Sequence, residues 1–503
     1  MTNLHVNNFE RDLGGRNNGE DNIKYQLHDD FSNEDLTKIM QDWRTNQYPR
    51  LESLQNYYNA HNTGILNRAK RTTGWADYKK SAPFPRQISD FITSFSVANP
   101  LTVSLPNSDQ SEHNGVDEFN RINDIDSHNY DVWLDTSIFG RAYELMYRGE
   151  DNATHIVRIS PLQGVGIYNL DVEPKLIAFV RVIENPIVDN GLVDIVVYRS
   201  NSIEKYNNVT LGIKIPNTPD EVENNPFWEV PVVEYVNNPQ RIGDFEPVLD
   251  MIDLYDFANN DTANFLTDLP NATLVVSGAL ETAFGASLDY DDDTDDDFEK
   301  VTDKKAREFK KSISDSAVIA LKNGVDAQGN NVETKAQYLH PDTDVSGNEA
   351  HKTRLENEIF RGAYVPNLAQ MAVGGNVTSG VAMQYKLIGT IQVAKRKRRL
   401  FERGLYKRYF IAKSIEHGAG WNFDVDMLKF TFTDNLPQDE VSILSELHAM
   451  GLVVPQSHMA ELIPSVTDVN EYLEQVKSEK EEQSEEYMNQ AQRDLIYDNA
   501  EED

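Results

Sequence analysis

The chain has 503 residues, of which 39% are hydrophobic and 26% charged, so wholesale disorder is excluded and a core is feasible in roughly three to four domains. Lys plus Arg number 47 and Asp plus Glu 82, and a net charge of −35 excludes binding of nucleic acid through overall charge. The chain has no cysteine, which excludes disulfides, thiolate metal sites and cysteine nucleophiles. We expect neither a secretory signal nor a membrane span, because residues 1–18 are polar and no apolar run approaches about 20 residues.

The first hundred residues predict a series of helices. Residues 1–30 are polar and rich in Asn, and we expect little order there. Ser32 has the character of a helix N-cap, and the apolar spacing that follows predicts a helix from 33 to about 44. Pro49 predicts a break before a second helix, and an apolar helix over 86–98 is ended by a proline at position 100.

Residues 116–235 predict a helix and then a sheet. Strand-like alternation recurs in the runs 141–148, 155–159, 176–182, 193–198 and 230–235. With the flanking helices, this pattern predicts an α+β body whose strands are mostly antiparallel.

The second half returns to long helices around a small insert. The expected elements are a helix over 244–268, strand-like runs at 272–276 and 317–321, a helix over about 344–363, a glycine-rich break at 373–380, a helix from 380 to about 416, a strand within 422–433, and an acidic helical region over 437–503.

Seven aspartates lie among the nine residues from Asp289 to Asp297. Closely spaced carboxylates bind Ca²⁺ or Mg²⁺, which makes Asp291, Asp293 and Asp295 weak metal candidates. The EF-hand pattern fails, since its sixth and twelfth positions carry Thr and Lys here. We interpret the run as a solvated, self-repelling loop.

Neither the glycine-rich segment nor the histidines have the pattern of a known catalytic or cofactor site. Gly375 and Gly380 have the spacing of a phosphate-binding loop, but the Lys and Ser/Thr that such a loop needs are replaced by Val381 and Ala382, so we expect no nucleotide or other cofactor there. The glycines instead predict a loop that leads into a helix, with Ser379 as its cap. The 11 histidines form no zinc pattern, and no nucleophile elbow is present.

One dense basic run is present, Lys395-Arg396-Lys397-Arg398-Arg399. These side chains are candidates for contact with DNA phosphates. A basic helix face paired with acidic neighbours also accounts for the run, and we favour that interpretation because charge runs on helices are usually solvated or salt-bridged faces.

Four pieces of sequence, taken in order, resemble a known family. They are Ser137-Ile-Phe-Gly-Arg-Ala-Tyr-Glu-Leu145; Val230-Pro-Val-Val-Glu-Tyr-Val-Asn-Asn238 with Gly243-Asp-Phe-Glu246; Gly375-Asn-Val-Thr-Ser-Gly-Val-Ala382; and Asn435-Leu-Pro-Gln-Asp439. Together, over roughly residues 30–480, they resemble the portal proteins of tailed bacteriophages, specifically the siphovirus portals of phages that infect Gram-positive bacteria. The Asp-rich insert and the polar N-terminal residues depart from the family pattern.

The resemblance implies the phage portal fold: a mixed α/β wing, two long stem helices, a small α/β clip and a helical crown, assembled as a ring. Its implied divisions are an N-terminal arm (1–30), the first part of the wing (31–243), stem helix 1 (244–268), the clip (269–343), stem helix 2 (344–363), a tunnel loop (364–379), a long wing helix with a return strand (380–436), and the crown with an acidic tail (437–503).

The resemblance also implies a function. Family members form a ring of about twelve subunits at one capsid vertex, through which double-stranded DNA passes during packaging and ejection. The implied partners are the large terminase subunit, the major capsid and scaffolding proteins and a head-completion adaptor, with no membrane and no catalytic activity of the chain's own. The expected location is the virion, and the host cytoplasm during assembly.

Within that expectation, the residues nearest the DNA are those of the tunnel loop: Gly374, Gly375, Asn376, Thr378 and Ser379. Two alternatives stay open. One is another ring-forming head–tail connector of the virion. The other is a divalent-metal-dependent enzyme that uses the aspartate run.

Overall fold

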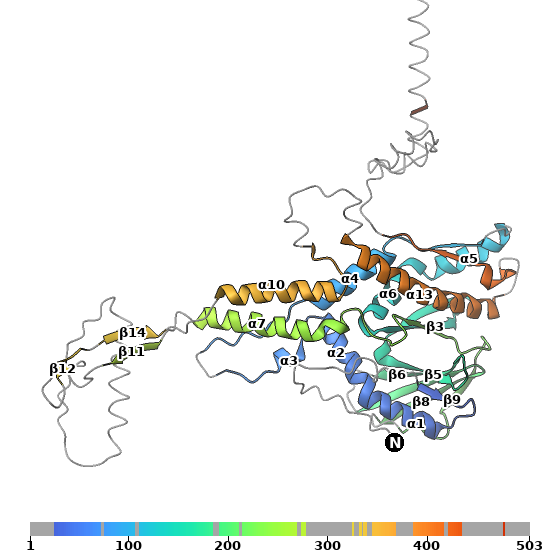
Figure 1. Cartoon of the computed structure of the whole chain (residues 1–503). Coiled ribbons are helices and arrows are strands. Elements are labelled where there is room, and N and C mark those ends of the chain that lie inside the picture. The colour runs from blue at the N-terminus through green and yellow to red at the C-terminus, as the bar shows by residue number, and fades with distance from the viewer. Residues whose placement is uncertain are drawn as a thin grey trace, which may run out of the picture.

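The protein is described by a computed structural model, which places residues 25–71, 75–105, 110–184, 191–210, 214–268, 273–277, 324–325, 331–333, 335–339, 345–368, 386–416, 421–434 and 476–477. Figure 1 shows an α+β body from which two long helices, α7 and α10, project side by side. A short strand pair, β11 and β14, lies at the far end of this projection.

Nine α-helices are described. They are α1 (Asn33–Asp42), α2 (Tyr48–Tyr58), α3 (Thr63–Leu66), α4 (Phe84–Val97), α5 (Gln110–Ile122), α6 (Ile125–Phe139), α7 (Leu249–Asp268), α10 (Val345–Gly362) and α13 (Ile388–Ile415).

The described strands follow the same chain order. They are β1 (Tyr25–Leu27), β2 (Thr102–Ser104), β3 (Arg141–Arg148), β4 (Thr154–Ile159), β5 (Gly164–Asn169), β6 (Leu176–Glu184), β7 (Leu192–Arg199), β8 (Ser202–Thr210), β9 (Glu221–Asn224), β10 (Val232–Val236), β11 (Thr273–Ser277), β12 (Gly324–Val325), β13 (Asn331–Val332), β14 (Lys335–Leu339) and β15 (Lys429–Thr431).

Two sheets form the centre of the body. One has the order β1-β5-β6-β7-β8-β9, and the other has the order β10-β3-β4. All their pairings are antiparallel except β1 with β5. The sheets are therefore mostly antiparallel, as the alternating sequence pattern predicts.

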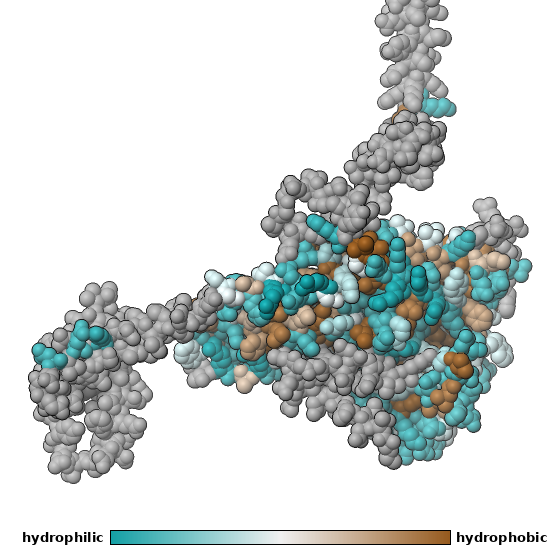
Figure 2. Space-filling view, viewed as in Figure 1, coloured by the Kyte–Doolittle hydropathy of each residue, from teal (hydrophilic) through white to brown (hydrophobic). Residues whose placement is uncertain are grey.

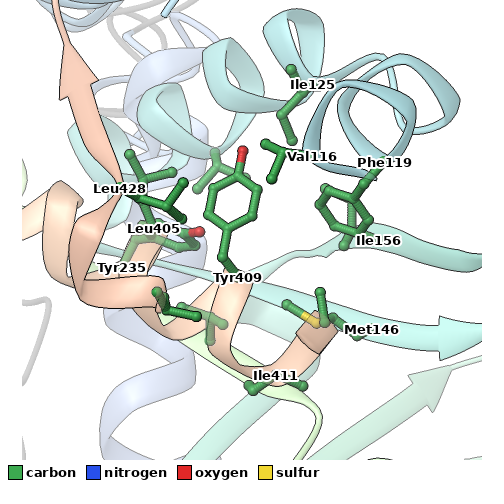
Figure 3. Close-up of a cluster of buried hydrophobic side chains, with 14 of the residues drawn as sticks. Val116, Phe119, Ile125, Met146, Ile156, Tyr235, Leu405, Tyr409, Ile411 and Leu428 are labelled. Carbon is green, nitrogen blue, oxygen red and sulfur yellow. The ribbon is translucent and has the colours of Figure 1, made fainter. Parts of the chain in front are cut away.

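The two sheets pack face to face between layers of helix. Helix α1 covers one face of the six-stranded sheet, and Phe179 on the other face meets Tyr143 and Leu145 of the three-stranded sheet. Because successive residues of a strand point to opposite faces, Met146, which follows Leu145 in β3, lies on the other face of the three-stranded sheet and packs against α13. Figure 3 shows the Tyr409 ring of α13 in that second core, pointing toward Val116.

The expectation of little order over residues 1–30 is wrong at its end, because Tyr25–Leu27 form β1 and pair with β5. The helices that follow begin close to where the sequence predicts them. Ser32 caps α1: its Oγ accepts from the Asp35 amide, and the Asp35 carboxylate accepts from the Ser32 amide. The predicted break at Pro49 is wrong, because a π-helical turn over Trp43–Gln47 joins α1 to α2 without interruption. Pro49 lies in the first turn of α2, where a proline is tolerated.

The second half agrees where it is described. Helices α7 and α10 match the two helices expected at 244–268 and 344–363, and β11 matches the strand at 272–276. Its partner β14 had no sequence prediction. The run at 317–321 and nearly all of 437–503 lie outside the described residues.

Candidate functional site

The base of the α7–α10 projection is fixed in the body by a core of its own. Its members come from α2, α4, α6 and the body-side ends of the two helices: Leu51, Leu54, Phe84, Ile88, Ile92, Ile138, Phe245, Leu249, Ile252, Ile359 and Phe360. The Phe84 ring packs edge-on against Tyr255 of α7 and Phe360 of α10, with centroids 4.8 and 5.6 Å away. Both helices are thereby anchored to α4.

An extended segment over residues 75–82, which we call the strap, runs along α7. Four α7 side chains, one per turn, accept hydrogen bonds from alternate backbone amides of the strap. The pairs are Asp268 with Ala76 (2.7 Å), Asn264 with Tyr78 (2.6 Å), Asn260 with Lys80 (2.7 Å) and Asp256 with Ala82 (2.7 Å).

The spacing of this ladder follows from backbone geometry. Four residues of an α-helix rise about 6.0 Å, and two residues of extended chain span roughly 6.4–6.8 Å, so the two rows stay in register over three intervals. Each of the four acceptor side chains is at least nine-tenths buried. The strap and α7 are therefore held together by polar groups that have little access to water.

We expect removal of one rung to loosen the strap selectively. In Asn260→Ala, the strap loses both the bond from the Lys80 amide and the bond from Asn260 Nδ2 to the Lys80 carbonyl (2.7 Å), at a cost of about 2–3 kcal/mol. Hydrogen exchange at the amides of residues 76–82 should quicken. The adjacent Asn259→Ala is the matched control, and an equal effect of both variants would contradict the ladder.

Three distant parts of the sequence meet where the chain enters α7. The Asp244 carboxylate accepts from Ser137 Oγ (2.6 Å), Asn237 Nδ2 (2.9 Å) and Lys397 Nζ (2.6 Å). Lys397 comes from α13 and is 3% exposed, and its burial lowers its pKa although Asp244 acts in the opposite direction. The segments at 137–145 and 243–246, which carry the family resemblance, are thus in direct contact.

Two glycines allow that contact. Gly140 has φ +81°, and a Cβ there would lie 2.0 Å from the Arg241 carbonyl oxygen. At Gly243 a Cβ would lie 2.5 Å from the Ile138 carbonyl oxygen. Because both obstacles are backbone atoms, no side chain fits at either position.

A second buried ion pair links α13 to β3. The Arg408 guanidinium donates to both carboxylate oxygens of Glu144 (2.6–3.0 Å) and to Asn129 Oδ1 (2.8 Å), and Arg408 and Glu144 are both 0% exposed. His128 lies 2.8 Å from the same carboxylate. Burial alone raises the pKa of Glu144, but Arg408 and His128 outweigh it and lower the pKa to about 2.

The basic run at 395–399 divides into two groups. Lys397 and Arg398 depart from the predicted phosphate contact, because their charged ends are buried and paired with Asp244 and Asp434 (2.6 and 2.5 Å). Lys395, Arg396 and Arg399 are exposed, and their contact with phosphate stays a prediction. The interpretation of a basic helix paired with acidic neighbours is confirmed for the first two.

Asp135 of α6 is a buried carboxylate with an incomplete set of partners. It is 4% exposed, and Arg158 donates to its Oδ1 (3.1 Å), while its Oδ2 has no described partner. Burial, with Arg158 acting in the opposite direction, raises its pKa to about 7. Because the folded-state pKa is raised, the proton bound at Asp135 stabilises the fold at low pH, and that stabilisation is lost as pH rises from about 4 to about 7.

Asp135→Asn is therefore expected to raise the free energy of unfolding at pH 8 by roughly 2–4 kcal/mol and to flatten its dependence on pH between 4 and 7. Urea unfolding at several pH values measures both effects. Asp126→Asn, exposed in the first turn of the same helix, is the control and should leave the dependence on pH between 4 and 7 unchanged. Lower stability of Asp135→Asn at pH 8 would show that the ion pair with Arg158 outweighs the burial cost.

The remaining predicted site residues are not described. The tunnel-loop residues Gly374, Gly375, Asn376, Thr378 and Ser379, and the metal candidates Asp291, Asp293 and Asp295, lie outside the described residues. Among the residues that are described, no group of three or more His, Asp or Glu side chains is placed to hold a metal ion. No described helix combines the length and apolarity needed to span a membrane.

Sequence reasoning missed three features: the Glu144–Arg408 pair, the Asp244–Lys397 pair and the ladder along α7. Only the ladder had a local signal, since Asp256, Asn260, Asn264 and Asp268 recur every four residues within a helix.

Comparison with known proteins identifies the family of this chain. No curated protein matches the chain. A solved structure described as "Neck of empty GTA particle computed with C6 symmetry" shares 10% sequence identity, covers 78% of this chain and 90% of its own, and has a TM-score of 0.42. The sequence also matches the family described as "Phage portal protein, SPP1 Gp6-like" over residues 37–486, which is most of the chain. The chain therefore belongs to the SPP1 Gp6-like family of phage portal proteins.

Proposed function

We propose that this portal protein forms a closed ring at one vertex of the capsid, through which double-stranded DNA passes during packaging and ejection. The ring is also the docking platform for the large terminase subunit, the capsid and scaffolding proteins and a head-completion adaptor. No residue is assigned a catalytic role or a cofactor. The observation that carries the proposal is the family match over residues 37–486.

The projection supports the division of the chain into portal domains. Helices α7 and α10 correspond to the paired stem helices, and the body corresponds to the wing. Strands β11 and β14 pair antiparallel, with Thr273 opposite Leu339, so they bring together the two ends of the insert between the helices. That arrangement suits a clip carried at the end of the stem, as Figure 1 illustrates.

Exposed apolar side chains on α7 support a ring. Leu254, Phe257 and Leu266 are 37%, 44% and 47% exposed on a helix that is otherwise packed against the strap and α10. Leu254 and Phe257 are three residues apart and lie on one side of the helix, whereas Leu266 lies on the side opposite Phe257. Neighbouring exposed apolar groups such as Leu254 and Phe257 are typical of surfaces that another chain covers. In a ring, the neighbouring subunit is the chain available to cover them.

The net charge also suits a conduit. A subunit of −35 repels phosphate at a distance, so a ring of such subunits passes DNA along without adhesion to its walls. Within the ring, we place the residues of the tunnel loop nearest the DNA. Replacement of Gly374 and Gly375 by Ala restricts the backbone of that loop, and we expect less DNA to be packaged.

The proposal is tested by assembling heads with and without this protein and measuring the DNA that becomes protected from nuclease. Heads that contain the protein should package DNA when terminase and ATP are supplied, and heads assembled without it should not. Equal packaging by both would overturn the proposal.

A further inference from the structure

Helix α13 has an unusual charge for this acidic chain. Its 28 residues include nine basic side chains and one acidic side chain, Glu402. Lys397, Arg398 and Arg408 are buried in ion pairs, and Lys407 pairs with Glu229 at the surface (2.9 Å). Lys413 donates to the Phe423 carbonyl. The other four cations are exposed and make no ion pair with another described residue: Lys395, Arg396, Arg399 and Arg403.

These four cations share one face of the helix. At 100° per residue they fall within an arc of about 100°, and the exposed ring of Phe410 lies in the same arc. We call this surface the α13 face. In Figure 2, hydrophilic residues lie over the middle of the region where Figure 1 places α13, and hydrophobic residues border them.

Trp228 extends the α13 face with a second exposed aromatic side chain. It is 80% exposed and has φ +56°, a left-handed conformation that is strained for so bulky a residue. Asn225 holds the strained turn: its amide donates to three carbonyls, among them that of Glu229 (2.6 Å), and its Oδ1 accepts from the Phe227 amide (3.1 Å). Backbone strain that the surroundings enforce in this way is typical of functional positions.

The turn is fixed directly to α13. Ser414 Oγ donates to the Phe227 carbonyl (2.9 Å), and Glu229 pairs with Lys407, so Trp228 lies between two residues that contact the helix. Lys407 and Ser414 also line an open pocket of about 550 Å³, whose other lining residues are Tyr406, Phe410, Lys413, Asp424, Val425 and Asp426. The α13 face thus combines an aromatic pocket with a row of cations.

We propose that the α13 face is a contact between neighbouring copies of this chain, in which its cations meet the acidic surface of the next subunit and Trp228 and Phe410 are buried. The inference rests on the proposed ring. Each copy carries a net charge of −35, so like-charged subunits repel unless a local patch of opposite sign is aimed at the neighbour. Arg, Trp and Tyr are also the residues that dominate binding energy at protein interfaces.

The same features argue against duplex DNA as the occupant. Phosphate contacts to a duplex need cations and polar groups, and they make no use of an exposed Trp and an apolar pocket. Stacking of aromatic side chains on base faces is typical of single strands, and in a duplex it requires a kink that unstacks the bases. A protein surface accounts for both the cations and the aromatic groups of the α13 face, whereas a DNA duplex accounts for the cations alone.

The test compares two variants with the same change in charge. In one, Arg396, Arg399 and Arg403 are each replaced by Glu. In the control, three exposed lysines away from α13, Lys38, Lys175 and Lys214, are each replaced by Glu. Light scattering measures the protein concentration at which half of the subunits are in rings, over a series of NaCl concentrations. The wild-type protein tests the proposed function separately. If the wild type forms no rings, the proposed ring is contradicted, whatever the variants do.

We expect the α13 variant to need at least about tenfold more protein for half-assembly at low salt, and the control variant to stay within about twofold of wild type. Trp228→Ala should also weaken assembly, with little dependence on salt. Equal assembly of the two charge variants would overturn the inference while leaving the ring intact. So would normal rings of the α13 variant that have lost only DNA packaging, because that result assigns the face to phosphate.

Discussion

Replacement of Arg408 by methionine is expected to lower the free energy of unfolding by about 3–5 kcal/mol. The substitution keeps an unbranched chain of similar length but removes the guanidinium, and the Glu144 carboxylate is then buried without the cation that pairs with it. The cost arises mainly from this unpaired charge, because a carboxylate that is 0% exposed has no access to water. Urea unfolding of the purified subunit at fixed concentration measures the loss.

The double variant Glu144→Gln with Arg408→Met separates the pair from simple packing. If the stranded charge is the cause, the double variant loses less stability than the sum of the two single variants. Arg403→Met, on the exposed side of the same helix, is the control and should change stability by less than about 0.5 kcal/mol. Strict additivity of the two single losses would contradict the account.

The pH dependence of this pair has a definite sign. The pKa of Glu144 in the folded state is lowered to about 2, so the pair contributes its full stabilisation above the ordinary carboxyl pKa of about 4.5. That contribution is lost as pH falls from about 4.5 to about 2. In the Arg408 variant, this acid-induced loss should be largely absent, since the stabilisation has already gone.

Gly140→Ala is expected to lower the free energy of unfolding by more than about 4 kcal/mol. It should also disrupt the contact between the segment 137–141 and the segment 241–246, which contains Asp244. The new methyl group would lie 2.0 Å from the Arg241 carbonyl oxygen, and a backbone atom cannot turn aside as a side chain can. The left-handed φ of +81° adds conformational strain to this overlap. Yield of folded protein and the midpoint of urea unfolding are the measurements.

Gly191→Ala supplies the matched control. Gly191 also has a left-handed φ, +68°, but no atom of the described residues lies within 4 Å of the added Cβ. Its substitution therefore pays the conformational cost alone, about 1–2 kcal/mol. If Gly140→Ala costs no more than Gly191→Ala, the close approach of the 137–141 and 241–246 segments is not what requires glycine there.

The sequence predicted elements whose signals are local. Four strands of the larger sheet, β1, β5, β8 and β9, had no sequence prediction. Ser32 with Asp35 marked the start of α1, and alternation marked β3, β4, β6, β7 and β10. Each depends on residues within one or two turns of one another. The predicted break at Pro49 was wrong because a π-helical turn, which has no clear sequence signature, places the proline inside the first turn of α2.

The functional surfaces were harder to predict because they depend on partners far along the chain. In the sequence, the basic run consists of five cations with no visible difference between them. Only the angular position of each residue around α13 decides which side chains are buried and which are exposed. Lys397 and Arg398 point to the side of Phe401 and Leu405, and so are drawn into the core, whereas Arg396 and Arg399 point away. The acceptor of Lys397, Asp244, lies 153 residues earlier, and no spacing rule connects the two.

The central claim is that this chain is a portal subunit that closes into a ring. The most direct test is the mass of the purified protein in a size-exclusion peak, measured by light scattering, with negative-stain images of the same peak. The account predicts particles of about twelve subunits with a central hole. A compact monomer of 57.2 kDa at every salt and protein concentration, with no ring in any image, would contradict it.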